Sequence, residues 1–195
     1  DISIDDLAER LTLAGLEVAG IDRIGEEWAR DKVFVGEVMR VEQHPNADRL
    51  TLVTVEYGAE EPLQVVTGAP NIRVGEQGMK VALALAGARL IDGHSETRRV
   101  VTLKPSKIRG VASSGMVCSE RELGLSDEHE GILELPADAP VGMPLADYLG
   151  DAVLDLDLTP NLSRCFSIIG VAREVDALLD KPVQVSEPAP ETTDE

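Results

Sequence analysis

One short segment brings together four side-chain types that could bind a ligand. His44–Leu50 reads His-Pro-Asn-Ala-Asp-Arg-Leu, so an imidazole, an amide, a carboxylate and a guanidinium lie within seven residues. Loops on a rigid sheet often carry such binding groups. Proline, asparagine and aspartate are also typical of a tight turn, because proline fixes φ and the other two bond back to their own backbone. The residue types alone therefore leave a structural turn and a binding loop both open.

Basic residues gather in the middle of an otherwise acidic chain. The 195 residues include 18 Lys and Arg against 36 Asp and Glu, and the net charge of −18 should repel nucleic acid at long range. Residues 62–109 nevertheless carry a local charge of +5, which leaves −23 on the remainder. Lys104, Lys107 and Arg109 end this segment. They could form a catalytic cluster, but exposed basic loops more often hold phosphates.

Catalytic and metal-binding patterns are missing from the sequence. We find no phosphate loop, dinucleotide fingerprint, HExxH pair or nucleophile elbow. Asp155 and Asp157 alternate with leucines, so the solvated face of a strand explains them better than a metal site does. Cys118 and Cys165 lie far apart, which argues against a zinc site or a disulfide framework and suits a reducing compartment. We therefore expect a binding module with no catalytic or metal-ligating residue.

The spacing of apolar residues indicates which elements must position these groups. From Val33 onward, short β-like runs alternate with turn residues, which favours an all-β barrel or sandwich. Five strands fit the small Greek-key barrel called the OB-fold, although a five-stranded sandwich half would read similarly. The basic stretch that follows reads as a loop, and one helical turn ending at Gly124 comes next. The candidate strands are 33–41, 50–57, 63–67, 79–86 and 98–103.

The two ends of the chain predict a second, smaller domain. Ser3 can cap a helix, and a strand is expected over 16–24. A strand over 153–159 and a helix that begins at Ser163 or Ser167 follow the β region. Neither end is long enough to bury a good core alone, so we expect an α+β chain with one domain inserted into another. The expected parts are a discontinuous α/β domain of 1–32 with 151–185, an OB-fold domain of 33–150, and a linker or tail of 186–195.

Several motifs in a fixed order resemble those of one protein family. His44–Leu50 resembles the opening motif of the tRNA-binding OB module that is found in methionyl- and tyrosyl-tRNA synthetase appendices and in EMAP II-like cytokines. Later segments look like the central turn and closing loop of that module. With these segments and their flanks in register, nearly the whole chain resembles the β subunit of bacterial phenylalanyl-tRNA synthetase. The later segments are 66–72, 107–111, 114–120 and 122–125, and the flanks are 7–18 and 157–175.

This resemblance implies an enzyme of two α and two β subunits that attaches phenylalanine to its tRNA with ATP and magnesium. It implies that catalysis belongs to the α subunit and editing to a later part of β, so no cofactor is expected in the present chain. The implied partners are phenylalanine-specific tRNA, the α subunit and a second β subunit in the cytoplasm, with no membrane or DNA partner. One stretch departs from the family: after Asn161 the usual Arg-Gly-Asp-Cys is replaced by Leu-Ser-Arg-Cys.

Eight residues are our candidates for contact with tRNA. Four are cations expected to touch phosphates without reading sequence, two shape the loop that carries the first cation, and two belong to the closing motif. The four cations are Arg49, Lys104, Lys107 and Arg109. The two residues that shape the loop are His44 and Asn46, and the two in the closing motif are Ser114 and Met116. Aromatic residues make up only 3% of the chain, which favours backbone contact over base stacking. The alternative is a structural module that packs against other synthetase domains with little RNA contact.

Overall fold

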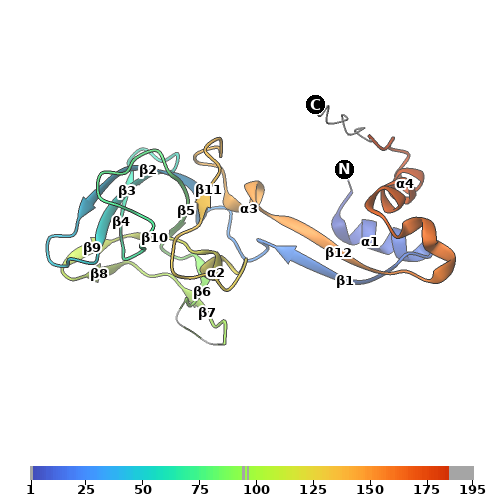
Figure 1. Cartoon of the computed structure of the whole chain (residues 1–195), viewed down its shortest axis with the longest axis horizontal. Helices are drawn as coiled ribbons and strands as arrows, with labels where there is room; N and C mark the ends of the chain where they lie inside the picture. Colours follow the sequence, from blue (N-terminus) through green and yellow to red (C-terminus); the bar gives the residue numbers. More distant parts are fainter. Residues whose placement is uncertain (1, 94, 96, 185–195) are drawn as a thin grey trace, which may run out of the picture. The chain divides into compact units, whose positions relative to one another are not determined.

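The computed structural model describes residues 2–93, 95 and 97–184, drawn in Figure 1. The linker or tail expected over 186–195 lies outside these residues. No helix in the described ranges combines the length and the apolar character needed to cross a membrane.

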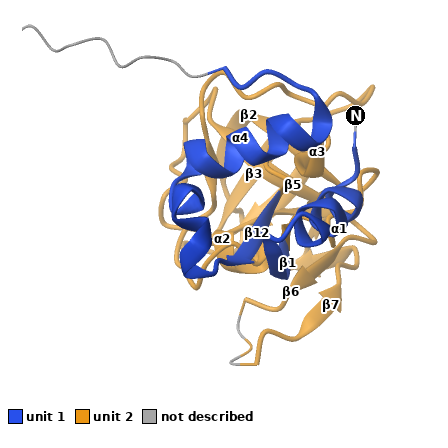
Figure 2. Ribbon diagram, turned by 90° about the vertical axis from the view of Figure 1, so that its right-hand side faces the viewer, with its two compact units in different colours: residues 1–22, 152–195 blue, residues 23–151 orange. Residues whose placement is uncertain are grey.

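The chain divides into two units, coloured separately in Figure 2. The first unit consists of residues 1–22 and 152–195, and the second consists of residues 23–151. The second unit is thus one continuous piece of chain set between the two parts of the first. Residues 23–32, which are expected in the discontinuous domain, group with the second unit, because Trp28 is buried in its core.

The first unit is a two-stranded sheet with helical segments. Ser3 caps the first helix as predicted, since its hydroxyl accepts a hydrogen bond from the Asp6 N–H at 3.1 Å. The Ser167 hydroxyl accepts a hydrogen bond from the Gly170 N–H at 3.1 Å, which makes Ser167 the residue that starts the last helix. The elements are α1 (Ile4–Leu13), β1 (Glu17–Ile24), β12 (Asp151–Asp157), a 3-10 helix (Pro160–Cys165) and α4 (Ile168–Leu179), and β1 pairs with β12.

Strand β12 shows the alternation that its sequence predicts. Asp155 and Asp157 are exposed, whereas the leucines between and around them are half-buried. That leucine face, together with residues of α1 and α4, lines an apolar groove of about 850 Å³. The two aspartates therefore form the solvated face of a strand, as expected.

The second unit is organised around an antiparallel sheet that nearly closes into a barrel. Its strands follow the order β10-β5-β2-β3-β4, and β11 also pairs with β5. The two ends of this path approach each other, because the Val66 N–H of β4 donates to the Ser113 hydroxyl at 3.0 Å, just before β10. The strands are β2 (Val33–Gln43), β3 (Thr51–Glu56), β4 (Leu63–Thr67), β5 (Lys80–Leu85), β10 (Gly115–Val117) and β11 (Glu134–Leu135).

The strand that closes this barrel is not among the five candidate strands. Residues 98–103 contain only β7 (Val100–Thr102), which pairs with β6 (Arg89–Ile91) in a separate two-stranded sheet. Strand β10 closes the barrel instead, and it comes from a stretch that reads as loop because small residues hide its pattern. Gly115 is needed there, since a Cβ at this position would lie 2.6 Å from the Ala84 carbonyl oxygen. The sheet has six strands, so the expected count of five is not confirmed.

Branched residues on alternating positions fill the barrel. Val53 of β3 pairs with Val65 of β4, and both are fully buried. A second cluster lies on the other side of β2 and β5, where Trp28 packs and its indole N–H donates to the Leu123 carbonyl at 3.0 Å. Trp28 is therefore a packing residue of this cluster. The remaining elements of the unit are β8 (Ser106–Ile108), β9 (Val111–Ser113), α2 (Glu120–Leu123) and α3 (Leu145–Tyr148).

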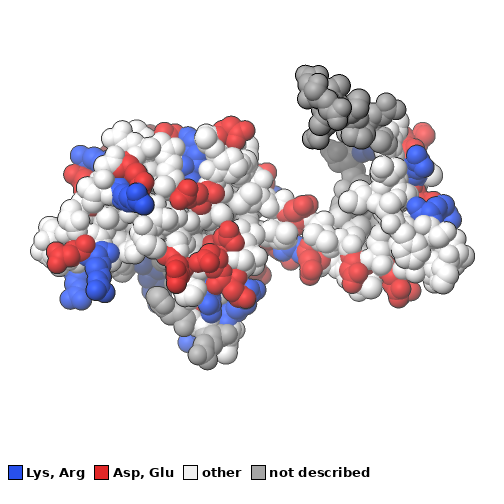
Figure 3. All heavy atoms as spheres, viewed as in Figure 1, with Lys and Arg blue, Asp and Glu red and all other residues white. Residues whose placement is uncertain are grey.

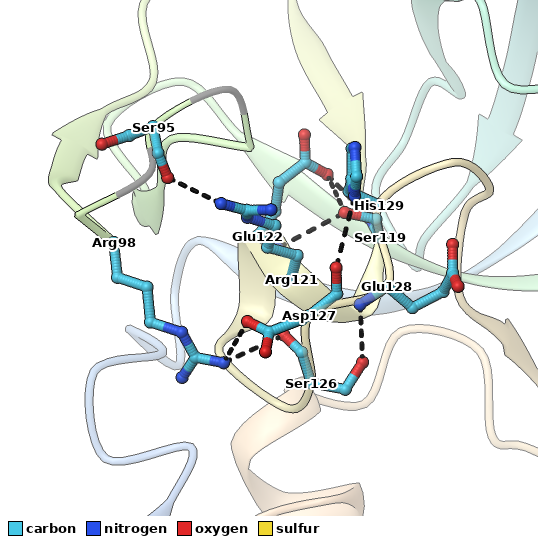
Figure 4. A network of polar contacts seen from close by, with 9 residues as sticks. All are labelled: Ser95, Arg98, Ser119, Arg121, Glu122, Ser126, Asp127, Glu128 and His129. Carbon is cyan, nitrogen blue, oxygen red and sulfur yellow. Dashed lines mark hydrogen bonds and ion pairs between the residues drawn. The ribbon is translucent and has the colours of Figure 1, made fainter.

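Polar contacts fix the loop after α2 to the loop that follows β6 (Figure 4). The Arg98 guanidinium pairs with Asp127 at 2.8 Å, and Arg121 donates to the Ser95 carbonyl at 2.7 Å. The Arg98 hydrogen bond is the main reason that the pKa of the Asp127 carboxyl lies below its usual value. Ser119 and Glu122 form a reciprocal capping box at the start of α2. Arg98 and Arg121 are therefore engaged with protein groups.

Candidate nucleic-acid interface

The segment from His44 to Leu50 is a tight turn that joins β2 to β3, as its proline, asparagine and aspartate indicate. The His44 N–H donates to the Leu50 carbonyl at 3.1 Å across the base of this turn. Inside it, the Gln43 side-chain amide donates to the Ala47 carbonyl at 3.0 Å and lies 3.3 Å from the carbonyls of Asp48 and Leu50. These bonds satisfy several backbone groups of the turn and hold its two ends together.

The imidazole of His44 is part of the protein interior. Its residue is only 2% exposed, and both ring nitrogens have partners. The Nδ1 atom accepts a hydrogen bond from the Asn46 N–H at 3.1 Å. The Nε2 atom lies 3.1 Å from the Ile108 carbonyl oxygen, which can only accept, so Nε2 carries the proton of a neutral ring. His44 thus shapes the loop from a buried position.

The same turn reaches the hairpin formed by β8 and β9. The Asn46 side-chain amide donates to the Arg109 carbonyl at 2.9 Å, next to the carbonyl that His44 holds. Arg109 and Gly110 are the two residues that link β8 to β9, and both have positive φ, 50° and 91°. This is the backbone of a type I′ hairpin turn. The opening motif and the Arg109 motif therefore meet in space.

The hairpin presents its basic side chains to solvent. Lys107 pairs in register with Ala112, and both are exposed, whereas Ile108 and Val111 on the other face are half-buried. Arg109 is exposed at the end of the hairpin. Figure 3 shows basic side chains protruding at the end of the unit where Figure 1 labels β8 and β9. We call the side chains of Lys107 and Arg109 the basic tip.

The basic residues of the second unit differ in whether an acidic residue neutralises them. Several form ion pairs, such as Arg40 with Glu42 at 3.1 Å and Arg89 with Glu27 at 3.0 Å. Others are exposed and have no acidic partner among the described residues: Arg49, Arg73, Arg99, Lys104, Lys107 and Arg109. All four cations predicted from the sequence belong to this second group. They are available to an anion that the protein does not itself supply.

The remaining predicted residues lie at two other places in the unit. Ser114 is exposed between β9 and β10, and its N–H lies 3.4 Å from the Gln64 carbonyl. Met116 is half-buried on β10 and lines a cleft of about 350 Å³. The structure therefore brings His44 and Asn46 together with Arg109, and places Ser114 and Met116 at the barrel closure.

Sequence reasoning missed two contributors to this site. Gln43 is the last residue of a strand, and its neighbours in the sequence do not indicate that its amide hydrogen-bonds to carbonyls of the turn that follows. The hairpin turn did carry a signal, since an Arg-Gly pair between β-branched residues resembles the dipeptides of two-residue hairpins. Segment 104–110 is expected as a loop, and three-residue strands are too short to show alternation.

A protein family profile matches most of the second unit. Residues 33–144 match the family described as putative tRNA binding domain. The matched range contains the 44–50 turn, the β8–β9 hairpin and all eight predicted residues.

Alignments with individual similar proteins cover more of the chain than the family profile does. The chain is 54% identical to the phenylalanine–tRNA ligase β subunit of Dehalococcoides mccartyi (strain CBDB1) over 188 residues. It is 46% identical to the protein of the same name from Coxiella burnetii over 185 residues. These alignments cover 96% and 94% of the chain but 22% of each relative, so the chain spans about a fifth of their length. Among solved structures, a MetRS-related protein from Pyrococcus horikoshii matches at a TM-score of 0.40 with 26% identity, over 57% of this chain and 86% of that one.

Proposed function

Because the chain belongs to the putative tRNA-binding domain family, we propose that its second unit is an OB-fold module that holds tRNA by its phosphates. The single observation that carries this proposal is the basic tip on its rigid base. Lys107 and Arg109 are exposed and unneutralised by described residues, while other cations of the unit are already paired. Cations of this kind gain most from phosphates, because binding releases counterions from the nucleic acid.

Contact with the RNA backbone fits this unit better than base stacking does. Of its aromatic residues, Trp28 is buried, Tyr148 packs against the Trp28 cluster, and Phe34 packs against Tyr57 with ring centroids 5.8 Å apart. None of these contacts involves Lys107 or Arg109. Proteins that grip single strands stack bases on exposed aromatics, whereas cations alone position a folded RNA without reading its sequence.

The larger role that we propose is that of an accessory region in a phenylalanine–tRNA ligase β subunit. The names of the similar proteins support it, and the chain spans about a fifth of their length. The partners would be phenylalanine-specific tRNA, the α subunit and a second β subunit in the cytoplasm. ATP and magnesium would serve the whole enzyme, and we propose no cofactor for the present chain.

The domain arrangement is part of the same proposal. We propose a tRNA-binding domain over 33–150 that is inserted into a discontinuous domain made of 1–32 and 151–185. The division of the chain at residues 22/23 and 151/152 supports an insertion, and it assigns residues 23–32 to the inserted unit.

A second candidate function is a packing module that makes little contact with RNA. The net charge of −18 favours it, as does the apolar groove of the first unit. Ile168 and Phe166 beside that groove are 90% and 66% exposed, and exposed apolar groups of this size often mark a surface that another domain covers.

Binding of the 195-residue chain to tRNA over a range of salt concentrations tests the proposal. We expect K107A/R109A to weaken binding roughly tenfold and to make the negative slope of log affinity against log salt shallower by about 2, since each phosphate contact contributes about −0.9. The control variant R40A/R89A removes the same charge from two neutralised cations and should bind as the parent does. Equal losses in the two variants would overturn the proposal, and so would tight binding that is insensitive to salt.

A further inference from the structure

We infer that His44 and Asn46 are positioning residues for RNA binding: they brace the Arg109-Gly110 turn and thereby aim the basic tip. This inference rests on the proposed function and deepens it. Neither residue is placed to contact RNA strongly itself, since His44 is buried and the Asn46 amide is committed to a protein carbonyl.

The backbone of Arg109 is the first observation behind this inference. Its φ of 50° lies in the left-handed region, at the first central position of a type I′ turn. Asn, Asp and Gly are the usual residues there, because a Cβ is crowded in that conformation. An arginine at this position holds a strained backbone while its side chain is exposed at the turn of the hairpin.

The hairpin is too short to hold such a turn by itself. Strands β8 and β9 have three residues each, and within the described part of the chain they pair only with each other as a two-stranded sheet. A two-stranded hairpin is marginal in water without further packing. The turn must therefore draw its stability from groups outside the hairpin.

Gln64 and Val66 of β4 contact strand β9, and the 44–46 turn supplies the groups that hold the Arg109-Gly110 turn itself. His44 Nε2 binds the Ile108 carbonyl at 3.1 Å and Asn46 Nδ2 binds the Arg109 carbonyl at 2.9 Å, so two consecutive carbonyls are held from one side. The next residue also lies against this brace, because a Cβ on Gly110 would stand 3.6 Å from Asn46 Nδ2. The brace is rigid in turn, since the Asn46 N–H binds His44 Nδ1 and Gln43 holds the loop from inside.

A braced tip binds RNA with a smaller loss of freedom than a mobile one. Fixing the turn before binding removes part of the ordering cost that an RNA contact would otherwise carry. Loss of the Asn46 amide should therefore weaken RNA binding even though it leaves every charge of the protein in place. Its effect should also depend on the presence of the Arg109 side chain.

A double-mutant cycle tests this dependence. The affinity of the 195-residue chain for tRNA is measured for the parent, N46A, R109A and N46A/R109A. We expect N46A to weaken binding about fivefold, the effect of one lost hydrogen bond, when Arg109 is present, and less than about twofold when it is absent. Asn46 is exposed, so N46A should fold, and its thermal midpoint is recorded as a check.

Three outcomes separate the possible failures. If N46A weakens binding equally with and without Arg109, Asn46 acts only on general stability and the inference is wrong. If R109A weakens binding but N46A does not, the inference fails while the proposed function stands. If neither R109A nor K107A affects binding, the proposed function itself fails. The variant R109G adds a further check, because it relieves the left-handed strain and should match R109A in affinity without any loss of stability.

Discussion

The side-chain amide of Asn46 donates a 2.9 Å hydrogen bond to the carbonyl oxygen of Arg109, 63 residues later in the chain. This bond joins the turn between β2 and β3 to the hairpin that carries the basic tip. The structural and the binding interpretation of the 44–50 turn are therefore compatible. The turn fixes the shape of the site, and the adjacent β8–β9 hairpin carries the exposed charge.

The buried imidazole of His44 should contribute strongly to stability. H44A would leave the Ile108 carbonyl and the Asn46 N–H without their partner in an interior site, and we expect it to lower the free energy of unfolding by about 2 kcal/mol. Urea unfolding measures this change. H129A is the control, because His129 is exposed, and its effect should stay within about 0.5 kcal/mol. Similar values for both variants would contradict the assigned role of His44.

Closure of the barrel should depend on the absence of a side chain at Gly115. A Cβ there would stand 2.6 Å from the Ala84 carbonyl oxygen and 2.7 Å from Leu63 Cδ2, so β10 would have to move away from β5. We expect G115A to cost about 2 kcal/mol or more of unfolding free energy. G20A is the control, since the nearest atom to its Cβ would be 3.9 Å away. A G115A protein as stable as G20A would show that the closure is looser than described.

The thiol of Cys118 should be inert in the folded protein. Burial raises its pKa well above the usual value, and the nearby Glu122 carboxylate raises it further, so little thiolate exists at neutral pH. In a C165S background, we expect Cys118 to react with a thiol reagent only as fast as the protein unfolds. The measurement is the rate of modification at pH 7 and 8, with and without urea. Rapid modification without urea would contradict its burial.

The ion pair of Arg98 with Asp127 should leave a signature at low pH. The folded-state pKa of Asp127 is lowered, chiefly by the Arg98 hydrogen bond, relative to about 3.9 in an unfolded chain. The pair therefore stabilises the fold above about pH 4, and this contribution is lost as the pH falls through the folded-state pKa. NMR titration of Asp127 in the parent and in R98A measures the shift. The pKa should return toward the usual value in R98A, and an identical pKa in both would exclude Arg98 as the cause.

The sequence predicted those helix ends, strands and turns that depend on interactions between neighbouring residues. Strand β4 matches its expected limits of 63–67, Ser3 caps α1, and Gly124 ends α2 as the turn residues indicate. The His44–Leu50 turn was equally readable, because Pro, Asn and Asp act on their own backbone.

The remaining features depend on contacts between distant segments. Strand β10 is defined by its pairing with β5, and its small residues show no alternation. The list of candidate strands therefore lacks β10, and the expected count of five is not confirmed. Likewise, no local pattern tells that Arg89 is neutralised by Glu27 while Lys107 is left unpaired among described residues. The net charge of a segment can be counted from its sequence, but the charge available at a site depends on which side chains form ion pairs in the fold.

The two ends of the second unit also have a consequence for how this chain is built. A Cβ on Gly25 would stand 3.3 Å from the Gly150 Cα, so the unit begins and ends at nearly the same point. A piece of chain with adjoining ends can be added to a loop, or removed from it, without stretching what flanks it. The second unit could therefore be inserted between β1 and β12, or deleted from between them, in a single step.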